Sequence, residues 1–372
     1  MKTVEGTSKS GPLFFWKEMG KTVGLTYDLK GDWKSHPDDP IDASAELDSI
    51  KTIDSIIEAL ETGGNRVKKI GNINNLLSQI DHLDVDIVFN IAEGHYGRNR
   101  ESQVPLLLEM KGIPYVGSDA LTLGVTLDKI VAKKCFIADR IPTPRYFDAK
   151  DTDDLKKLNT IGFPLIVKCR YEGSSKGLSK KSKVDDYASL KKQVDHINKA
   201  YKQSAIVEEF ISGTEFTVGV LGNGNLETMP VVQVAIEGKL DLGDDFYTFS
   251  RLLRPDLVEY VCPAKISKKL SERLQKIAIQ AYKAVDCRDF GRVDFRVDEK
   301  GNPYVLEINP LPCLSKEDVF YVAPKAMGTT YEEMINRILR FGLERYGLTN
   351  GKYKVKGSHN LRNDSEHKLR AH

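Results

Sequence analysis

The sequence predicts an α/β (α+β) protein whose chain begins with a parallel α/β unit. Two observations support this fold class. Between residues 21 and 124, short apolar segments alternate with segments of helical periodicity, which is typical of a parallel sheet. Farther along the chain, strand-like segments follow one another more closely, and two of them flank a Gly/Asn turn as in a β-hairpin.

The first unit is expected to alternate strands and helices along the chain. They are predicted, in the order strand, helix, strand, helix, strand, at Thr22–Tyr27, Ala43–Thr62, Asp86–Ile91, Gln103–Met110 and Ile113–Val116. Gly63 and Gly64 directly follow the first helix, and glycine commonly ends a helix. A helix at Thr126–Arg140, which ends close to two prolines, leads out of this unit.

Two more units follow. Their elements are predicted at Leu165–Cys169, 186–200 (helix), Ala205–Phe210, Glu215–Leu221, Met229–Ile236, Ser267–Val285 (helix), the hairpin, and 330–346 (helix). The expected domains are therefore 21–124, 125–205 and 206–348, with a flexible extension at 1–20 and a flexible tail at 349–372.

The hairpin, residues 291–310, carries the most informative pattern. We expect Asp294 to lie opposite Glu307 and Arg292 opposite Asn309, with 296 paired to 305 and 298 to 303. The core face would then consist of Val293, Phe295, Val297, Tyr304, Leu306 and Ile308. Facing carboxylates about 5 Å apart repel each other. They indicate either a magnesium site, which prefers such oxygen ligands, or a solvated outer face of a surface hairpin.

Composition narrows the functional classes. Among 372 residues, 40% are hydrophobic and the net charge is +2, so no overall field favours nucleic acid or a membrane surface. The longest apolar runs are too short to span a bilayer. The five cysteines have no paired spacing, which is typical of reduced thiols. We expect a cytoplasmic protein without nucleic-acid or membrane partners.

A strand that ends in Lys168 continues into a loop with Glu172, Gly173, Ser174 and Ser175. Glycines let backbone N–H groups approach phosphate oxygens, serine hydroxyls add donors, and lysine adds a mobile charge. The spacing is not that of a P-loop. The loop therefore indicates phosphate binding, or else a flexible surface hairpin.

Two weaker signals accompany this loop. The carboxylates of Glu208, Glu209 and Glu215 lie at strand edges, where they could accept hydrogen bonds from an adenine amine and ribose hydroxyls, or could simply be solvated. Lys129 is expected one turn into a helix, where an ordinary exposed lysine is the plainer interpretation.

Together these motifs resemble the ATP-grasp superfamily, and within it the D-alanine–D-alanine ligase group. The resemblance runs from about residue 86 to 346 and follows the family's order of motifs. These are Gly112–Ser118, Asp128-Lys129, Ile141–Pro144, Glu172–Ser175, Gly213–Thr217, Cys262–Ala264, Gly291–Asp294 and Glu307–Asn309. The resemblance implies a three-domain ATP-grasp architecture with an N-terminal parallel α/β (pre-ATP-grasp) domain, and it suggests a homodimer.

The resemblance also implies roles for individual residues. Lys129 and Lys168 would bind the phosphates of ATP. Glu172, Ser174 and Ser175 would lie in the loop that closes over them, and Glu208 and Glu215 would accept from adenine and ribose beside the backbone of Glu209 and Phe210. Asp294, Glu307 and Asn309 would hold two Mg²⁺ ions, with Mn²⁺ as a substitute, and Arg292 would stabilise the developing oxyanion. Such enzymes join a carboxylate to an amine through an acyl phosphate and release ADP and phosphate.

The substrate-binding positions depart from the family. The family's Gly-Gly turn, with a downstream serine and glutamate that bind an ammonium, is not found after the first strand, where Asp28 is the available substitute. Glu93 replaces a histidine, and Asp318 aligns with a serine that meets the acceptor's carboxylate. Arg251 and Ser315 are the other substrate candidates, whereas Cys313 is expected to pack and not to react.

We therefore predict a carboxylate–amine ligase with at least one substrate other than D-alanine. Two alternatives stay open, an ATP-grasp kinase of small molecules and a nucleotide-binding homologue without catalytic activity. Amine-dependent ADP formation with release of free phosphate would separate the ligase from both.

Overall fold

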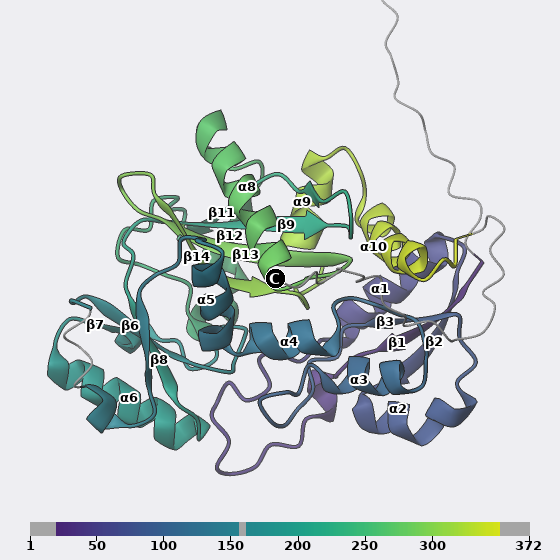
Figure 1. Ribbon diagram of the computed structural model, residues 1–372, viewed down its shortest axis with the longest axis horizontal. Coiled ribbons are helices and arrows are strands. Elements are labelled where there is room, and N and C mark those ends of the chain that lie inside the picture. The colour runs from purple at the N-terminus through teal and green to yellow at the C-terminus, as the bar shows by residue number, and fades with distance from the viewer. Residues whose placement is uncertain (1–19, 156–160, 350–372) are drawn as a thin grey trace, which may run out of the picture.

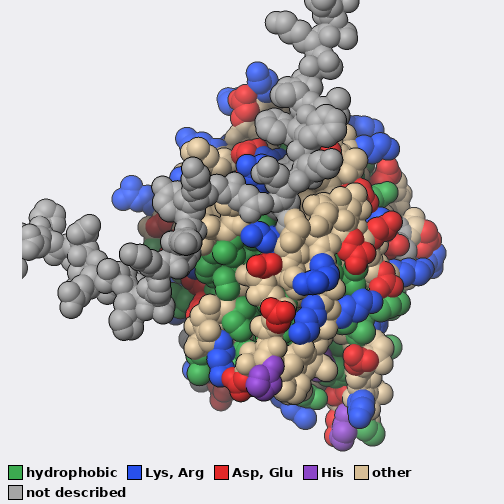
Figure 2. Space-filling model, turned by 90° about the vertical axis from the view of Figure 1, so that its right-hand side faces the viewer, with side chains coloured by type: hydrophobic (Ala, Val, Ile, Leu, Met, Phe, Trp, Pro, Cys, Tyr) green, Lys and Arg blue, Asp and Glu red, His purple; other side chains and the backbone are tan. Residues whose placement is uncertain are grey.

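The computed structural model describes residues 20–155 and 161–349. The predicted flexible segments 1–20 and 349–372 lie almost wholly outside the described residues. The described chain forms three sheets, each with helices packed against it, around a common centre (Figure 1). In the view of Figure 2, basic and acidic side chains are interspersed over the surface, as is usual for a solvated face.

The N-terminal sheet is parallel throughout, as the sequence predicts. Its order is β2-β1-β3-β4, and its strands are β1 Thr22–Thr26, β2 Arg66–Gly71, β3 Ile87–Asn90 and β4 Tyr115–Val116. One face packs on α1 (Ile50–Thr62) and α10 (Tyr331–Arg345), and the other on α2 (Ile73–Gln79) and α3 (Gln103–Met110) (Figure 1). Side chains of β3 alternate between these layers because successive residues of a strand point to opposite faces.

The last helix of the chain packs on this first sheet. Thr330 and Glu333 form a capping box at the start of α10, and one face of the helix, with Ile335, Ile338 and Leu339, is fully buried. Burial of each such side chain stabilises the fold by about 1.5–3 kcal/mol. Asn336 Nδ2 donates to Ala59 O at 2.6 Å. The helix therefore joins the C-terminal part of the chain to the N-terminal sheet.

The first helix is shorter than predicted. It begins at Ile50, where Ser49 is the N-cap and accepts from Thr52 N at 3.1 Å, and not at Ala43. Residues 41–46 form turns instead. Serine favours the N-cap because its side chain competes for backbone donors. As a result, Glu46 and Asp48 lie on a loop and not on a helix.

The single helix predicted at Thr126–Arg140 is two helices. These are α4 (Ala120–Leu127) and α5 (Lys129–Ala138), and Asp128 between them caps α5 by accepting from Ile130 N at 3.1 Å. Lys129 is therefore the first residue of α5 and not one turn into a helix. The break turns the new N-terminus toward the centre of the molecule.

The central sheet is antiparallel, with the order β5-β8-β6-β7. Its strands are β5 Tyr146–Ala149, β6 Leu165–Cys169, β7 Lys183–Val184 and β8 Ala205–Glu209, and helix α6 (Tyr187–Tyr201) packs against it. The domain boundary predicted at 205/206 falls inside β8. Phe210, which was predicted as part of this strand, follows it directly.

The third sheet is the largest, with the order β12-β11-β9-β13-β14 and β10 paired to β9. Its strands are β9 Thr214–Leu221, β10 Glu227–Thr228, β11 Val232–Ile236, β12 Val258–Val261, β13 Phe290–Val297 and β14 Pro303–Asn309. The helices here are α7 (Phe249–Leu252), α8 (Lys268–Ala284) and α9 (Val319–Ala326). Short 3₁₀ turns lie at Lys30–Asp32, Ile80–His82, Lys180–Ser182 and Pro255–Leu257.

The predicted hairpin is β13–β14, but part of its register is wrong. Asp294 pairs with Glu307 and Arg292 with Asn309, as expected, whereas Arg296 pairs with Tyr304 and not with Val305. A bulge at Leu306 causes this shift. Because a one-residue slip exchanges the two faces of a strand, Val305 is fully buried, whereas Leu306 lines the central cavity and Tyr304 is only partly buried.

In the part of the chain that the structure describes, the helices are all too short or too polar to cross a bilayer.

Candidate active site

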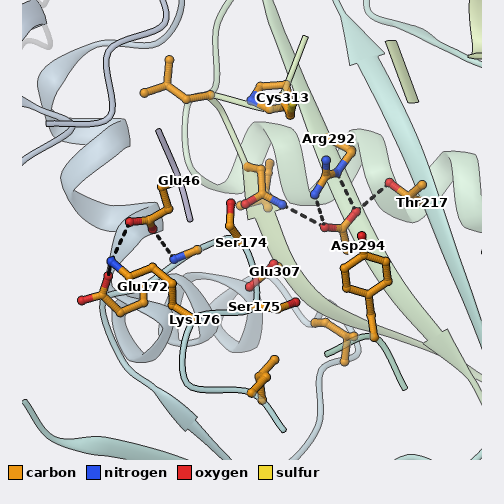
Figure 3. Close-up of a pocket in the computed structure, with 18 of the residues that line it drawn as sticks. Glu46, Glu172, Ser174, Ser175, Lys176, Thr217, Arg292, Asp294, Glu307 and Cys313 are labelled. Carbon is orange, nitrogen blue, oxygen red and sulfur yellow. Dashed lines mark hydrogen bonds and ion pairs between the residues drawn. The ribbon is translucent and has the colours of Figure 1, made fainter. Parts of the chain in front are cut away.

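A cavity of about 380 Å³ lies where the three sheets meet. The loop before α1 and the segment after β3 form one wall, the loop after β6 and the end of β8 form a second, and strands β9, β13 and β14 form the third. Figure 3 shows side chains from all three walls pointing into the same space. The phosphate-loop, metal and adenine-edge residues predicted from sequence therefore share one cavity.

The carboxylate of Asp294 lies at the centre of a hydrogen-bond network. It accepts from Arg292 Nε at 3.0 Å, from Thr217 Oγ1 at 2.6 Å and from Asn309 Nδ2 at 2.9 Å (Figure 3). The amide oxygen of Asn309 and the carboxylates of Asp294 and Glu307 are hard oxygen donors on neighbouring strands, which suits Mg²⁺. Within residues 20–155 and 161–349, however, no three His, Cys, Asp or Glu side chains converge on a metal position, so phosphate or water oxygens would have to complete the shell.

Glu307 is neutralised by a lysine from another element. Lys129 Nζ, at the start of α5, is 2.7 Å from Glu307 Oε2. Burial alone would raise the pKa of Glu307, but the ammonium of Lys129 outweighs it and lowers the pKa to about 2. The break at Asp128 makes this pairing possible, because it places Lys129 at the end of a helix that points toward the hairpin.

Glu208 does not face the cavity as a free acceptor. It is buried, with 1% of its side chain exposed, between Lys168 Nζ at 2.7 Å and Lys133 Nζ at 2.8 Å. Burial would raise its pKa, yet the two ammonium groups lower the pKa to about 2. Lys133 was not singled out from sequence, although its spacing of four residues from Lys129 puts both on one face of α5. Glu208 thus orients Lys168, the lysine expected at the phosphates.

The loop after β6 is held closed over the cavity. Ser174 and Ser175 have positive φ angles of 44° and 57°, a conformation that few residues other than glycine adopt. Glu46 accepts from Lys176 Nζ at 3.0 Å (Figure 3) and from Gly173 N. Asp42 accepts from Gly177 N at 2.7 Å. The loop before α1 therefore supports this strained turn from the opposite wall.

The residues expected around adenine form the deep end of the cavity. The backbone N–H groups of Glu209 and Phe210 donate to Arg145 O and Pro164 O at 2.9 and 3.0 Å, so they fix the strand end in place. The carboxylate of Glu215 forms an ion pair with Arg296, whose Nη1 is 2.8 Å from Glu215 Oε1. The side chains of Phe210 and Leu306 add apolar surface to the lining. Such a pocket fits a flat, largely apolar ring with polar edges.

Arg292 also contacts Asp318, which lies at the end of the cavity away from the residues expected around adenine. Its Nη1 is 3.3 Å from Asp318 Oδ1, while Asp318 caps α9 by accepting from Val319 N at 2.6 Å. An arginine thus stands between Asp318 and the hairpin. Cys313 lies on the same wall (Figure 3). Although the side chain is accessible to solvent, its position inside the cavity raises the pKa of the thiol, so the thiol is protonated at neutral pH.

Two predicted substrate residues do not line the cavity in the described part of the chain. Arg251 is buried, with its guanidinium bonded to Asp245 Oδ2 at 2.6 Å and to Phe246 O at 2.7 Å, and Ser315 lies just outside the lining. Arg251 is therefore placed to hold the loop before α7. Asp28 is likewise outside the lining and pairs with His95 at 3.0 Å.

Sequence reasoning missed the glutamate on the N-terminal wall. The loop before α1 carries Ser44 and Glu46, neither of which was singled out from the sequence. Glu46 lines the cavity and is 2.7 Å from Arg100 Nη2. A long loop separates this pair from β1, and the helix predicted from residue 43 hid it. Ser49, a favourable N-cap residue, was the sequence signal that the helix begins at Ile50 and that residues 43–48 belong to a loop.

Three further carboxyl groups line the N-terminal wall, namely Asp48, Glu93 and Glu101. Glu93 was predicted as a substrate residue, and the other two were not. Burial raises the pKa of Asp48 and of Glu101 to about 7, and burial together with Glu101 raises the pKa of Glu93 well above its usual value.

A cavity that combines lysines, a closed Gly/Ser loop and facing carboxylates across three sheets defines an ATP-grasp fold. A solved D-alanine–D-alanine ligase from Bacillus anthracis in complex with ATP superimposes with a TM-score of 0.68 and 23% sequence identity, over 88% of this chain and 99% of that one.

Sequence comparison narrows the class. The family model described as D-ala D-ala ligase C-terminus matches residues 141–340. A D-alanine–D-alanine ligase of Carboxydothermus hydrogenoformans is 34% identical over 80% of this chain and 94% of its own length. An uncharacterized protein of Sinorhizobium fredii, y4sG, is 35% identical over 79% of this chain and 88% of its own length. The chain therefore belongs to the D-alanine–D-alanine ligase family, whose members are ligases that form carbon–nitrogen bonds.

Proposed function

We propose that this protein is an ATP-dependent ligase that joins a carboxylate to an amine through an acyl phosphate, with at least one substrate other than D-alanine. The observation that carries the proposal is the convergence of Lys129, Lys168 and Arg292 on one cavity with Asp294 and Glu307, beneath the closed loop. We place the reaction in the cytoplasm, where ATP is available, and the homodimer suggested by the resemblance stays a prediction.

The phosphate end of the cavity suits phosphoryl transfer. Such transfer needs charge neutralisation and positioning more than covalent help. Lys168, oriented by Glu208, and Lys129, paired with Glu307, would offer their ammonium groups to the phosphates. Asp294, Glu307 and Asn309 would hold Mg²⁺, which would neutralise phosphate charge when bound.

The closed loop has a second use. Gly173 N and Gly177 N are bonded to Glu46 and Asp42, which holds the loop across the cavity, and there it would shield bound phosphates from solvent. An acyl phosphate hydrolyses readily, and a shielded site protects it until the amine attacks. Ser174 and Ser175 would supply hydroxyl and backbone donors to the phosphate.

Arg292 is suited to the carbonyl of the carboxylate substrate. Its guanidinium is held by Asp294 and Asp318 on two sides, which fixes its orientation toward the cavity. A fixed cation stabilises the charge that develops on the carbonyl oxygen when the amine attacks. Glu46 is suited to the ammonium of the first substrate, because it lies on the opposite wall.

The substrate end supports divergence from D-alanine. Asp318 stands where the family has a serine for the acceptor's carboxylate, and its partner Arg292 is shared with Asp294. An acceptor carboxylate would meet a negatively charged group there. Glu93, in place of a histidine, adds another carboxyl to the lining.

The test measures ADP and free phosphate separately, with ATP, Mg²⁺ and a panel of D- and L-amino acids. We expect amine-dependent formation of both in equal amounts, together with a peptide or amide product. ADP formation without free phosphate would instead favour a kinase, and ATP binding without turnover on any substrate would favour the inactive homologue. Strong, selective turnover with D-alanine alone would contradict the divergence.

A further inference from the structure

The acidic residues of the cavity divide into two groups. Most have a cationic partner at ion-pair distance: Glu46, Glu172, Glu208, Glu209, Glu215, Asp294, Glu307 and Asp318. Asp48, Glu93 and Glu101 form neither a hydrogen bond nor an ion pair through their side chains to any described residue. These three are referred to as the unpaired carboxylates.

Their burial makes this lack of partners costly. Glu101 is only 8% exposed, and the side chains of Asp48 and Glu93 are partly buried. Charged groups removed from water without a partner are strongly disfavoured. Burial is the main cause that raises the pKa of all three. A neighbouring carboxylate adds to it in each case: Asp28 for Asp48, Glu101 for Glu93, and Glu46 for Glu101.

The cation that follows most directly from the sequence, Arg100, is already paired with other groups. Arg100, adjacent to Glu101 in sequence, directs Nη2 to Glu46 at 2.7 Å and Nη1 to Tyr171 O at 2.7 Å. The cations expected with ATP would lie at the hairpin and the phosphate loop, on the other walls, and ATP brings its own negative charge. Neither neutralises the unpaired carboxylates.

An inorganic cation fits this wall poorly. Within the described ranges, acidic, histidine and cysteine side chains do not gather in threes around a point where a metal could bind. The unpaired carboxylates instead come from two segments, the loop before α1 and the segment after β3. An organic cation needs less convergence than a metal ion, because charge-assisted hydrogen bonds to one or two carboxylates suffice for an ammonium, and the five N–H donors of a guanidinium spread over a wider fork.

We propose that Asp48, Glu93 and Glu101 bind a second positive charge on the amino-acid substrate, so that this ligase acts on a dibasic amino acid with an ammonium or guanidinium side chain. The proposal rests on the proposed function, and it names the substrate class that function leaves open. Binding would give the unpaired carboxylates a cationic partner, which no described residue of the protein provides.

The experiment compares basic amino acids with neutral analogues of similar shape. Lysine, ornithine and arginine would be assayed in both enantiomers against norleucine, norvaline and citrulline, with ADP and phosphate release as the readout. We expect kcat/KM for at least one basic amino acid to exceed that for its neutral analogue by about 10- to 100-fold, since a buried charge pair favours its ligand by that order. Equal values for basic and neutral substrates would overturn the proposal.

Substitutions then assign the effect to the unpaired carboxylates. Glu101→Gln and Glu93→Gln should raise KM for the basic amino acid by about tenfold or more and leave KM for ATP unchanged. The matched control is Glu61→Gln, an exposed glutamate on α1 outside the cavity, which should change neither. A similar loss for basic and neutral substrates in the cavity variants would contradict the proposal.

Binding measurements separate this inference from the proposed function. If no amino acid supports turnover, calorimetric titration of the wild-type protein with lysine, ornithine and arginine remains decisive. Binding that weakens at least about tenfold in Glu101→Gln would support the cation site although the ligase function had failed. Turnover with neutral amino acids only would keep the ligase and overturn the cation site, as would the absence of binding by any basic amino acid.

Discussion

The acidic side chains are paired with cations or amides at one end of the cavity and unpaired at the other. At the hairpin and phosphate loop, each acidic side chain has a lysine, arginine or amide partner, as Glu208 has in Lys133 and Lys168. On the N-terminal wall, Asp48, Glu93 and Glu101 line the cavity with no partner in the described chain. The paired end is already organised to receive a nucleotide, whereas the unpaired end is complete only when a ligand arrives. Pre-organised charge favours catalysis, and unsatisfied charge favours selection.

The largest effect is expected from the hairpin. Asp294→Asn removes the charge that Arg292, Thr217 and Asn309 surround while keeping the size of the side chain. We expect kcat for ADP formation to fall about 100- to 1000-fold, because Asp294 would hold the Mg²⁺ that neutralises the phosphates, and the amide would hold it less well. Steady-state kinetics at saturating ATP test this. A wild-type rate would remove Asp294 from the reaction, and an unchanged melting temperature would exclude misfolding as the cause of a loss.

The next effect concerns the stability of the paired end. Lys133→Met should lower the free energy of unfolding by roughly 2–4 kcal/mol, because it leaves the buried Glu208 with one cation instead of two. Urea unfolding at pH 7.5 measures it. Arg254→Gln, which breaks a pair that is 60% exposed on both sides, is the matched control and should leave the free energy of unfolding nearly unchanged, because water screens exposed pairs. Equal effects from both variants would show that the buried ion pair adds little.

At the unpaired end, removal of a charge should raise the free energy of unfolding instead of lowering it. The folded pKa of Glu101 is about 7, above its usual value of 4.5, so the folded state binds more protons between these values than the unfolded state. Stability from this group is therefore present below pH 4.5 and lost as the pH rises through 7. Arg100 and Lys129 act against the shift, whereas Glu46 and Glu172 act with it.

Glu101→Gln tests that sign directly. At pH 8 the variant should be more stable than the wild type by roughly 1–3 kcal/mol, and the difference should vanish near pH 4.5. Urea unfolding across this pH range gives the comparison. A variant that is less stable at pH 8 would mean that Glu101 has a favourable partner when ionised.

The smallest effect is expected where the two ends meet, at the support of the phosphate loop. Tyr201→Phe removes the hydroxyl that donates to Asp42 at 2.9 Å, while Asp42 keeps its bond to Gly177 N. We expect the ratio of phosphate released to amide formed to rise about 2- to 5-fold, since a looser loop admits water to the acyl phosphate. Parallel assays of phosphate and product measure the ratio. A ratio of one in the variant would show that this bond does not control closure.

Much of the fold followed from local patterns. The helix Gln103–Met110 and the strand Leu165–Cys169 have the bounds that their periodicity predicted, and the parallel N-terminal sheet followed from the alternation of elements. Errors occurred where one residue changes the local geometry. Asp128 splits a helix by capping the next one, and the bulge at Leu306 exchanges the two faces of β14 only in the part before Glu307. Such details depend on packing partners that local sequence does not specify.

The candidate site divides in the same way. The sequence alone determined the Gly/Ser loop after β6, the lysine before it and the facing carboxylates of the hairpin, because each is carried by residues adjacent in the chain or across one turn. Only the tertiary structure decided that Lys133 neutralises Glu208, that Glu46 reaches Lys176, and that Arg251 faces away from the cavity. It also brought Asp48, Glu93 and Glu101 onto one wall, where no described residue pairs with their side chains. Charge pairs between residues far apart in the sequence depend on which walls of the cavity the fold brings together. The local order of residues does not show which of them will meet.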